Sequence, residues 1–137
     1  MKTFEQFLRE EEDIWYHGAG SHIKKFGGSP LYLTRDEKEA TGFAHGLHLG
    51  GKGSSPHIHA ISARPGKTIN IDTAIEDAMN NDDDLGDRID KEFIKAKTSG
   101  ARYVEHLHPS FGGGDDFTAR VSLYPHQDLT IKTFKKI

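Results

Sequence analysis

A histidine, a glycine and two aromatic residues form the pattern in this sequence that could carry chemistry. His17 and Gly18 lie at the end of an expected strand, Tyr32 lies in the next strand, and Phe43 lies in the helix after it. An imidazole and a glycine backbone offer hydrogen bonds, and two aromatic rings offer flat apolar surfaces. This set suits a planar ring clamped between Tyr32 and Phe43, with its amide held by the backbone of Gly18. Packing of the two aromatic rings in the core explains the same pattern, so both interpretations stay open.

Three other motifs match known sites only in part. Residues 46–53 nearly spell the phosphate-binding loop, but Gly53 replaces the hydroxyl residue that binds magnesium. Residues 81–92 follow the spacing of a calcium loop except at Leu85, which offers no oxygen. Four histidines could gather a zinc ion, but no carboxylate stands at a fixed spacing from them; they are His45, His48, His57 and His59. We therefore expect no metal site, and expect instead a flexible loop, a solvated acidic turn and surface histidines.

Apolar periodicity and turn residues predict the elements that position these residues. The expected strands begin at Ile14 and cover 31–34, 57–63, 68–71, 101–107, 117–124 and 129–134, and the expected helices cover 34–45, 73–79 and 87–97. Thr34 and Glu37 match a capping box at the start of the first of these helices. Ile58 and Ala60 are expected on the buried face of their strand. Because strands and helices are segregated along the chain, the order favours an α+β fold over a parallel doubly wound sheet.

Composition limits the classes of function. With 137 residues and a formal net charge of -3, the chain is expected to form one domain around one core. The absence of cysteine excludes disulfide scaffolds, thiolate zinc sites and cysteine nucleophiles. Because nothing indicates an oxidising compartment, we expect the protein to be located inside a cell or a virion. No apolar run approaches the roughly 20 residues that span a bilayer, so no membrane partner is expected. Mild acidity with scattered Lys and Arg argues against a nucleic-acid partner.

At the residues named first, the sequence resembles the ADP-ribosyltransferase superfamily, in the branch of diphtheria toxin and the poly(ADP-ribose) polymerases. The resemblance rests on Tyr16-His17-Gly18, on Tyr32-Leu33-Thr34 and on the segment from Ala40 to Phe43, and it covers residues 14–137. It implies a single α+β domain with split antiparallel β-sheets and a few short flanking helices. It also implies NAD as the cofactor and mono-ADP-ribosylation of a host target as the activity.

The resemblance further implies roles for single residues. His17 would bond the adenosine ribose of NAD, Gly18 would hold the carboxamide, and Tyr32 and Phe43 would stack on nicotinamide. Thr34 belongs to the same cofactor-binding segment. Nicotinamide would leave through an oxocarbenium-like transition state, whose charge a carboxylate normally stabilises.

The sequence departs from the family pattern where that carboxylate is expected. Alignment of the final strand places Arg120 at the glutamate position, and arginine cannot serve as an anion. Asp115 and Asp116 could reach the site if their loop folds inward, and Glu105 on the preceding strand is another candidate. The departure leaves three possibilities: an acid from elsewhere, altered chemistry, or a domain that only binds nucleotide. The candidate catalytic residues are His17, Tyr32, Asp116 and Arg120.

The first ten residues carry a second resemblance. Phe4, Phe7 and Leu8 form one apolar stripe, typical of a terminal helix packed on a domain. The same segment is similar to the capsid-targeting peptides of internal head proteins in T-even-like bacteriophages, which are cut after a Leu-x-Glu triplet such as Leu8-Arg9-Glu10. This implies a propeptide at 1–10, cleaved by the prohead protease, and a working domain at 11–137.

The two resemblances together imply an internal head protein that is stored in the virion and injected into the host cytoplasm. There it would act as an NAD-dependent mono-ADP-ribosyltransferase on a host protein. The alternative is a catalytically inactive ADP-ribosyltransferase-like protein that binds a nucleotide or inhibits a host-defence protein by contact alone.

Overall fold

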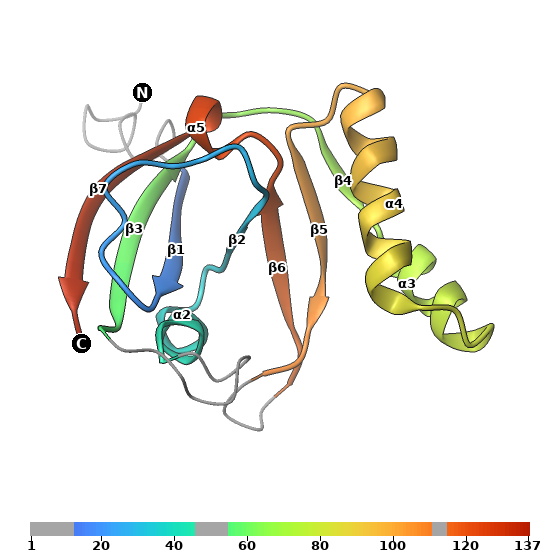
Figure 1. Cartoon of the computed structure of the whole chain (residues 1–137), viewed down its shortest axis with the longest axis horizontal. Coiled ribbons are helices and arrows are strands. Elements are labelled where there is room, and N and C mark those ends of the chain that lie inside the picture. The colour runs from blue at the N-terminus through green and yellow to red at the C-terminus, as the bar shows by residue number, and fades with distance from the viewer. Residues whose placement is uncertain (1–12, 46–54, 111–114) are drawn as a thin grey trace, which may run out of the picture.

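Two β-sheets and a few short helices make up the α+β fold of this chain (Figure 1). The computed structural model describes residues 13–45, 55–110 and 115–137. The propeptide predicted at 1–10 and its cleavage after Glu10 lie outside the described residues, as do His48 and the partial phosphate-loop motif at 46–53. None of the described helices is long and apolar enough to cross a membrane.

Seven strands form the two sheets. The three-stranded sheet has the order β1-β3-β7, and the four-stranded sheet has the order β2-β6-β5-β4. The first contains β1 (Asp13–Ala19), β3 (His57–Ala63) and β7 (Leu129–Lys136), and the second contains β2 (Leu31–Leu33), β6 (Phe117–Ser122), β5 (Tyr103–His108) and β4 (Thr68–Asn70). The strand positions predicted from the sequence are confirmed, with small differences at their ends.

Four described helices connect the strands: α2 (Glu37–Ala44), α3 (Asp72–Asn80), α4 (Leu85–Thr98) and the short α5 (Pro125–Asp128). The helices expected at 73–79 and 87–97 are confirmed, although α4 begins two residues earlier because Asp84 caps it through the amide of Asp87. The expectation of antiparallel sheets is confirmed for every strand pair except β4 and β5, which pair in parallel. The α3–α4 pair forms the crossover that a parallel connection requires.

The hydrophobic core has two main parts, one between the sheets and one beneath the long helices. The cluster between the sheets contains Trp15, Leu33, Ile61, Ala63, Tyr103 and Leu129. The second cluster lies where α3 and α4 cover the four-stranded sheet, and contains Ile71, Ala96, Ala101, Val104, Val121 and Leu123. The predicted buried face of β3 was wrong in part: Ile58 is buried but Ala60 only partly, while His59, Ile61 and Ala63 are buried on the opposite face.

Helix α2 starts differently from the predicted capping box. Asp36 is the N-cap, and its carboxylate accepts a hydrogen bond of 2.8 Å from the amide of Lys38. The Thr34 hydroxyl instead accepts from the amide of Asp36 at 3.0 Å. The box at Thr34 and Glu37 is wrong because a backbone bridge to Tyr16 holds Thr34 in extended conformation, which moves the helix start along the chain.

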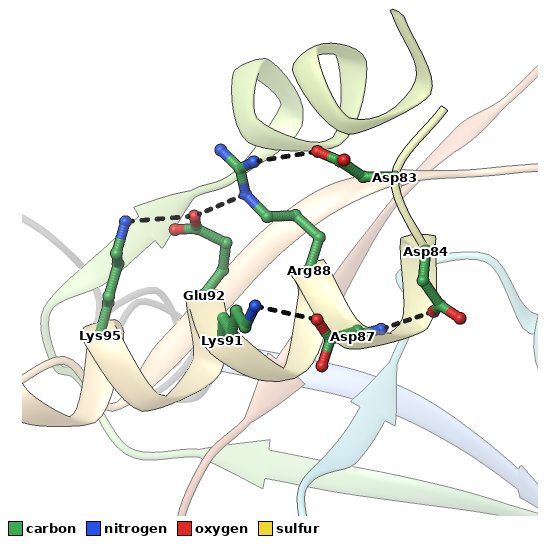
Figure 2. Close-up of a pocket in the computed structure, with 7 residues that line it drawn as sticks. All are labelled: Asp83, Asp84, Asp87, Arg88, Lys91, Glu92 and Lys95. Atoms are coloured by element: carbon green, nitrogen blue, oxygen red, sulfur yellow. Dashed lines mark hydrogen bonds and ion pairs between the residues drawn. The ribbon is translucent and has the colours of Figure 1, made fainter. Parts of the chain in front are cut away.

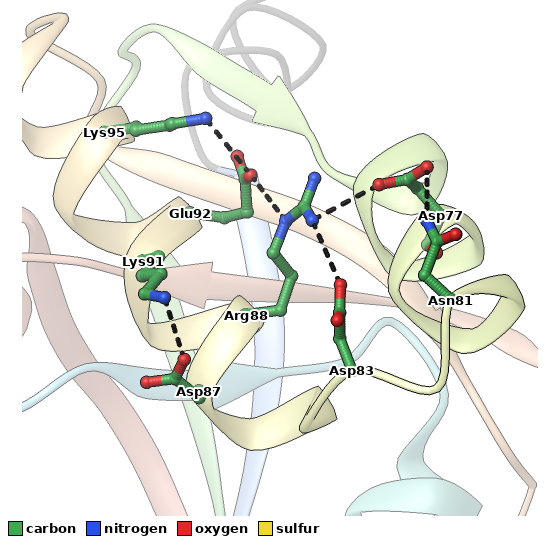
Figure 3. A network of polar contacts seen from close by, with 8 residues as sticks. All are labelled: Asp77, Asn81, Asp83, Asp87, Arg88, Lys91, Glu92 and Lys95. Atoms are coloured by element: carbon green, nitrogen blue, oxygen red, sulfur yellow. Dashed lines mark hydrogen bonds and ion pairs between the residues drawn. The ribbon is translucent and has the colours of Figure 1, made fainter.

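A network of ion pairs joins α3 to α4 (Figure 3). The Arg88 guanidinium lies 3.3 Å from the Asp77 carboxylate, 3.9 Å from that of Asp83 and 3.3 Å from that of Glu92. Exposed pairs contribute about 0–1 kcal/mol each, so the network orients the hairpin more than it stabilises the fold. The acidic residues of the partial calcium motif are therefore engaged with a cation of the protein.

Gly18 lets α2 pack directly on β1. A Cβ atom at Gly18 would lie 1.7 Å from the carbonyl oxygen of Ala40 and 2.6 Å from the amide nitrogen of Ala44. Both neighbours are backbone atoms of α2, so no side-chain movement could relieve the contact. The position of Phe43 on this helix therefore depends on a glycine at position 18.

The substitution Gly18→Ala is expected to lower the free energy of unfolding by about 2–3 kcal/mol, because it overpacks a backbone contact. Urea denaturation measures the change. Gly27→Ala is the control, since no atom lies within 4 Å of its added Cβ, and it should stay within about 0.5 kcal/mol of wild type. Equal stability of the two variants would contradict the close packing of β1 and α2.

Candidate functional site

The side chain of His17 separates β1 from β2 at the centre of the molecule. Tyr16 and Thr34 exchange two backbone hydrogen bonds, of 2.7 and 2.9 Å, in an isolated antiparallel bridge. In a continued ladder the next hydrogen-bonded pair would join Gly18 to Tyr32. Instead, the carbonyl of Tyr32 accepts a hydrogen bond of 2.7 Å from Nδ1 of His17. An imidazole thus takes the place of a backbone pair, and the strands diverge there.

This arrangement fixes how His17 and Gly18 present their polar atoms. A carbonyl can only accept, so His17 carries its proton on Nδ1, and Nε2 of the neutral ring is an acceptor. The backbone groups of Tyr16 point toward β2, and those of Gly18, two residues further along the strand, point the same way. The amide and carbonyl of Gly18 therefore face the gap where β1 and β2 separate.

Tyr32 and Phe43 lie side by side, as the sequence predicts. Their ring centroids are 6.5 Å apart with an angle of 42° between the planes. Stacked rings lie about 3.5–4.0 Å apart, so a planar guest between two rings needs roughly 7 Å and near-parallel planes. The two rings are in tilted contact, so a planar guest between them requires Phe43 to move away from Tyr32 and turn parallel to it. His108 extends the cluster, with its centroid 5.3 Å from that of Phe43 and 6.4 Å from that of Tyr32.

The hydroxyl end of Tyr32 is anchored in the protein. It lies 3.0 Å from Nε2 of His106, and Nδ1 of that ring donates to the carbonyl of Leu107 at 2.9 Å. The Tyr32 hydroxyl is therefore the donor to His106. Burial raises the pKa of the Tyr32 phenol above its usual value, and the nearby carboxylate of Asp90 raises it further. The ring is held as a neutral surface, partly packed against the core under α3 and α4.

Arg120 lies on the other face of the four-stranded sheet. It is in register with Leu33 on one side and Glu105 on the other, and its guanidinium bonds the Glu105 carboxylate at 3.0 and 2.7 Å. The same guanidinium lies 4.4 Å from the Trp15 ring centroid, between the sheets. Tyr32 faces the opposite side, against the core under the helices. The structure therefore does not bring Arg120 and Tyr32 together.

The remaining predicted residues lie in different surroundings. Thr34 is 2% exposed and serves the bridge to Tyr16 and the turn before α2. Asp115 and Asp116 are exposed, just before β6 begins at Phe117. Of the predicted set, the structure gathers His17, Gly18, Tyr32 and Phe43.

His108 belongs to the same ring cluster, and Glu39 lies on α2 one helical turn before Phe43; sequence reasoning missed both. Glu39 is 7% exposed and accepts a hydrogen bond of 2.6 Å from the hydroxyl of Ser110. It precedes Phe43 by four residues, and this spacing, which places two side chains on the same side of a helix, is the signal that could have identified it. His108 comes from a strand far along the chain, and no local pattern connects it to α2.

A second group of rings lies around His59, which is fully buried. Nε2 of His59 accepts a hydrogen bond of 2.9 Å from the amide of Ile23, and the ring stacks on His22 at 5.7 Å. His57 lies 6.3 Å from the same ring. Within the described residues, no three metal-ligating side chains are arranged to hold an ion. The expectation of surface histidines is wrong for His59, because the ring is covered by His22, by the backbone of Ile23 and by Phe134.

A surface pocket of about 450 Å³ lies along α4, from Asp83 to Lys95 (Figure 2). Its lining is charged throughout, and many of these charges pair with one another: Lys91 with Asp87 at 3.0 Å, and Lys95 with Glu92 at 3.6 Å. None of the ring-bearing residues of the candidate site lines it. This charged pocket therefore does not suit the planar ring that the sequence predicts.

Comparisons with protein-family models, with curated proteins and with solved structures find no match to this chain.

Acid is expected to destabilise the fold through His59. Burial lowers the pKa of this imidazole, a backbone interaction with His17 offsets part of that shift, and the charges of His22 and His57 lower the pKa a little further. Below about pH 6.5 the unfolded state therefore binds a proton more readily than the folded state does. Lowering the pH from about 7.5 to about 5.5 should therefore lower the free energy of unfolding through this residue.

His59→Gln isolates that contribution, because its amide oxygen can accept from Ile23 without titrating. Denaturation of both proteins at the two pH values gives the comparison. The variant should lose less stability in acid than wild type, and an equal loss would refute the assignment.

Proposed function

We propose that this protein is an NAD-dependent mono-ADP-ribosyltransferase with its nicotinamide site between Tyr32 and Phe43. The observation that carries the proposal is the aromatic pair at 6.5 Å beside the point where His17 holds β1 and β2 apart. Two rings, a backbone amide and carbonyl, and an imidazole acceptor match a planar heterocycle with a carboxamide and a ribose. The resemblance to the ADP-ribosyltransferase superfamily rests on the same residues.

Each residue has a distinct task in the proposed mechanism. Tyr32 and Phe43 stack on the nicotinamide ring, and the backbone of Gly18 pairs with its carboxamide. Nε2 of His17 accepts a hydrogen bond from a ribose hydroxyl, while Nδ1 keeps the ring oriented on the Tyr32 carbonyl. NAD supplies the ADP-ribosyl group. The bond between the ribose anomeric carbon and the nicotinamide nitrogen breaks, and an acceptor nucleophile on a host protein bonds to that carbon.

Removing one stacking ring is expected to weaken NAD binding without unfolding the protein. An aromatic pair contributes about 0.5–1.5 kcal/mol beyond burial, so Phe43→Leu should raise the Kd for NAD about 2- to 12-fold. His17→Ala should abolish labelling of host lysate with ADP-ribose. Calorimetry and a labelled-NAD assay measure the two effects.

Phe134→Leu is the matched control, because Phe134 is half exposed on β7 and stacks on His22 rather than on Tyr32. It should bind and label like wild type. If wild type shows neither labelling nor release of nicotinamide, the enzyme proposal fails.

A second candidate function is nucleotide binding, or inhibition of a host-defence protein, without catalysis. Arg120 favours it, since this residue stands at the glutamate position of the family pattern and pairs with Glu105 between the sheets. Calorimetric binding of NAD or of a partner without nicotinamide release would support this candidate.

We also propose that residues 1–10 direct the protein into a phage prohead, whose protease removes them after Glu10. The support is the sequence of this segment alone. Cleavage removes Lys2 and Arg9 together with Glu5 and Glu10, so the formal net charge stays at -3. Mass spectrometry of purified virions should detect a form beginning at Glu11, and a virion form beginning at Met1 would contradict the proposal.

A further inference from the structure

The Glu39 carboxylate lies on the helix that carries Phe43, and it bonds Ser110, two residues after His108. Ala40 and Ala44 face β1, where Gly18 meets the backbone of α2. Glu39 and Phe43 are four residues apart, so they lie on the same side of the helix, next to the face that carries Ala40 and Ala44. Both side chains contact the end of β5 and the residues after it, because Glu39 bonds Ser110 and Phe43 packs near His108.

The other carboxylates considered for this site are placed less well. Glu105 is paired with Arg120 and faces the space between the sheets, on the side opposite Tyr32. Asp115 and Asp116 are exposed to solvent. Asp90 is exposed on α4, and its charge acts on the phenol of Tyr32. Among these carboxylates, Glu39 alone is both buried and on the helix that carries Phe43.

We propose that Glu39 is the catalytic carboxylate of this site, an inference that rests on the proposed transferase function. Its bond from the Ser110 hydroxyl shows that the carboxylate accepts from an alcohol in this position. A ribose hydroxyl is the same kind of donor, so it can replace Ser110 when the sugar binds. The site thereby regains the negative charge that Arg120 cannot supply.

The carboxylate acts on the charge that develops during transfer. The bond between the ribose anomeric carbon and the nicotinamide nitrogen breaks, and its electron pair leaves with nicotinamide. Glu39 stabilises the positive charge that develops on the sugar, and this electrostatic attraction is stronger in a buried site than in water. The acceptor nucleophile then bonds to the anomeric carbon and gives up its proton to solvent.

Three variants separate this role from a structural one. Glu39→Gln keeps an oxygen that can accept from Ser110 but removes the charge. Ser110→Ala removes the hydrogen bond but keeps the charge. Glu37→Gln is the matched control, because Glu37 lies in the same turn of α2 but is exposed and paired with Lys135 at 2.5 Å.

The experiment measures nicotinamide release and the Kd for NAD with the full chain. Glu39→Gln should lower kcat about 10²- to 10³-fold, as expected for loss of a preorganised charge, while the Kd changes little. Ser110→Ala and Glu37→Gln should stay within about threefold of wild type in kcat.

The outcomes distinguish the two proposals. An active wild type with an equally active Glu39→Gln variant would overturn the role of Glu39 and leave the transferase function standing. Equal losses in Glu39→Gln and Ser110→Ala would assign Glu39 to holding the Ser110 segment, and would also overturn its catalytic role. A wild type that neither binds nor cleaves NAD would overturn both proposals.

Discussion

The bridge between Tyr16 and Thr34, followed by the bond from His17 to the Tyr32 carbonyl, is the constraint on which the site depends. The bridge ties the two sheets together at one pair of residues. The imidazole then replaces the next backbone pair, so the strands separate without leaving the Tyr32 carbonyl unsatisfied. Gly18 faces the resulting gap, and its missing side chain allows α2 to approach β1.

The same geometry divides the charged and aromatic groups between the two faces of the four-stranded sheet. Strand alternation places Arg120 against Trp15 between the sheets, where Glu105 neutralises it. Tyr32 faces the other side, near Phe43 and His108. Alignment places Arg120 at the position of the missing acid, but the side chain at this position lies on the face of the sheet opposite Tyr32. The proposed acid therefore belongs to α2 and not to β6.

Much of the fold could be predicted from the sequence, because apolar periodicity and turn residues act locally. The strand at 57–63 and the helices after Ile71 and Asp84 follow from such patterns. Contacts between distant segments could not be predicted: the parallel pairing of β4 with β5, the burial of His59 and the approach of His108 to Phe43. The pairing of Tyr32 with Phe43 was expected because the two residues lie on consecutive elements. Glu39 was not identified because it follows two other charged residues, Glu37 and Lys38, in a short helix.

The most direct test of the account is a crystal structure of the protein with bound nicotinamide. The account predicts the pyridine ring between Tyr32 and Phe43, with its carboxamide on the amide and carbonyl of Gly18 and the His17 bond to Tyr32 unchanged. Nicotinamide bound elsewhere, or a site in which Phe43 and Tyr32 pack directly on each other at saturating ligand, would contradict it.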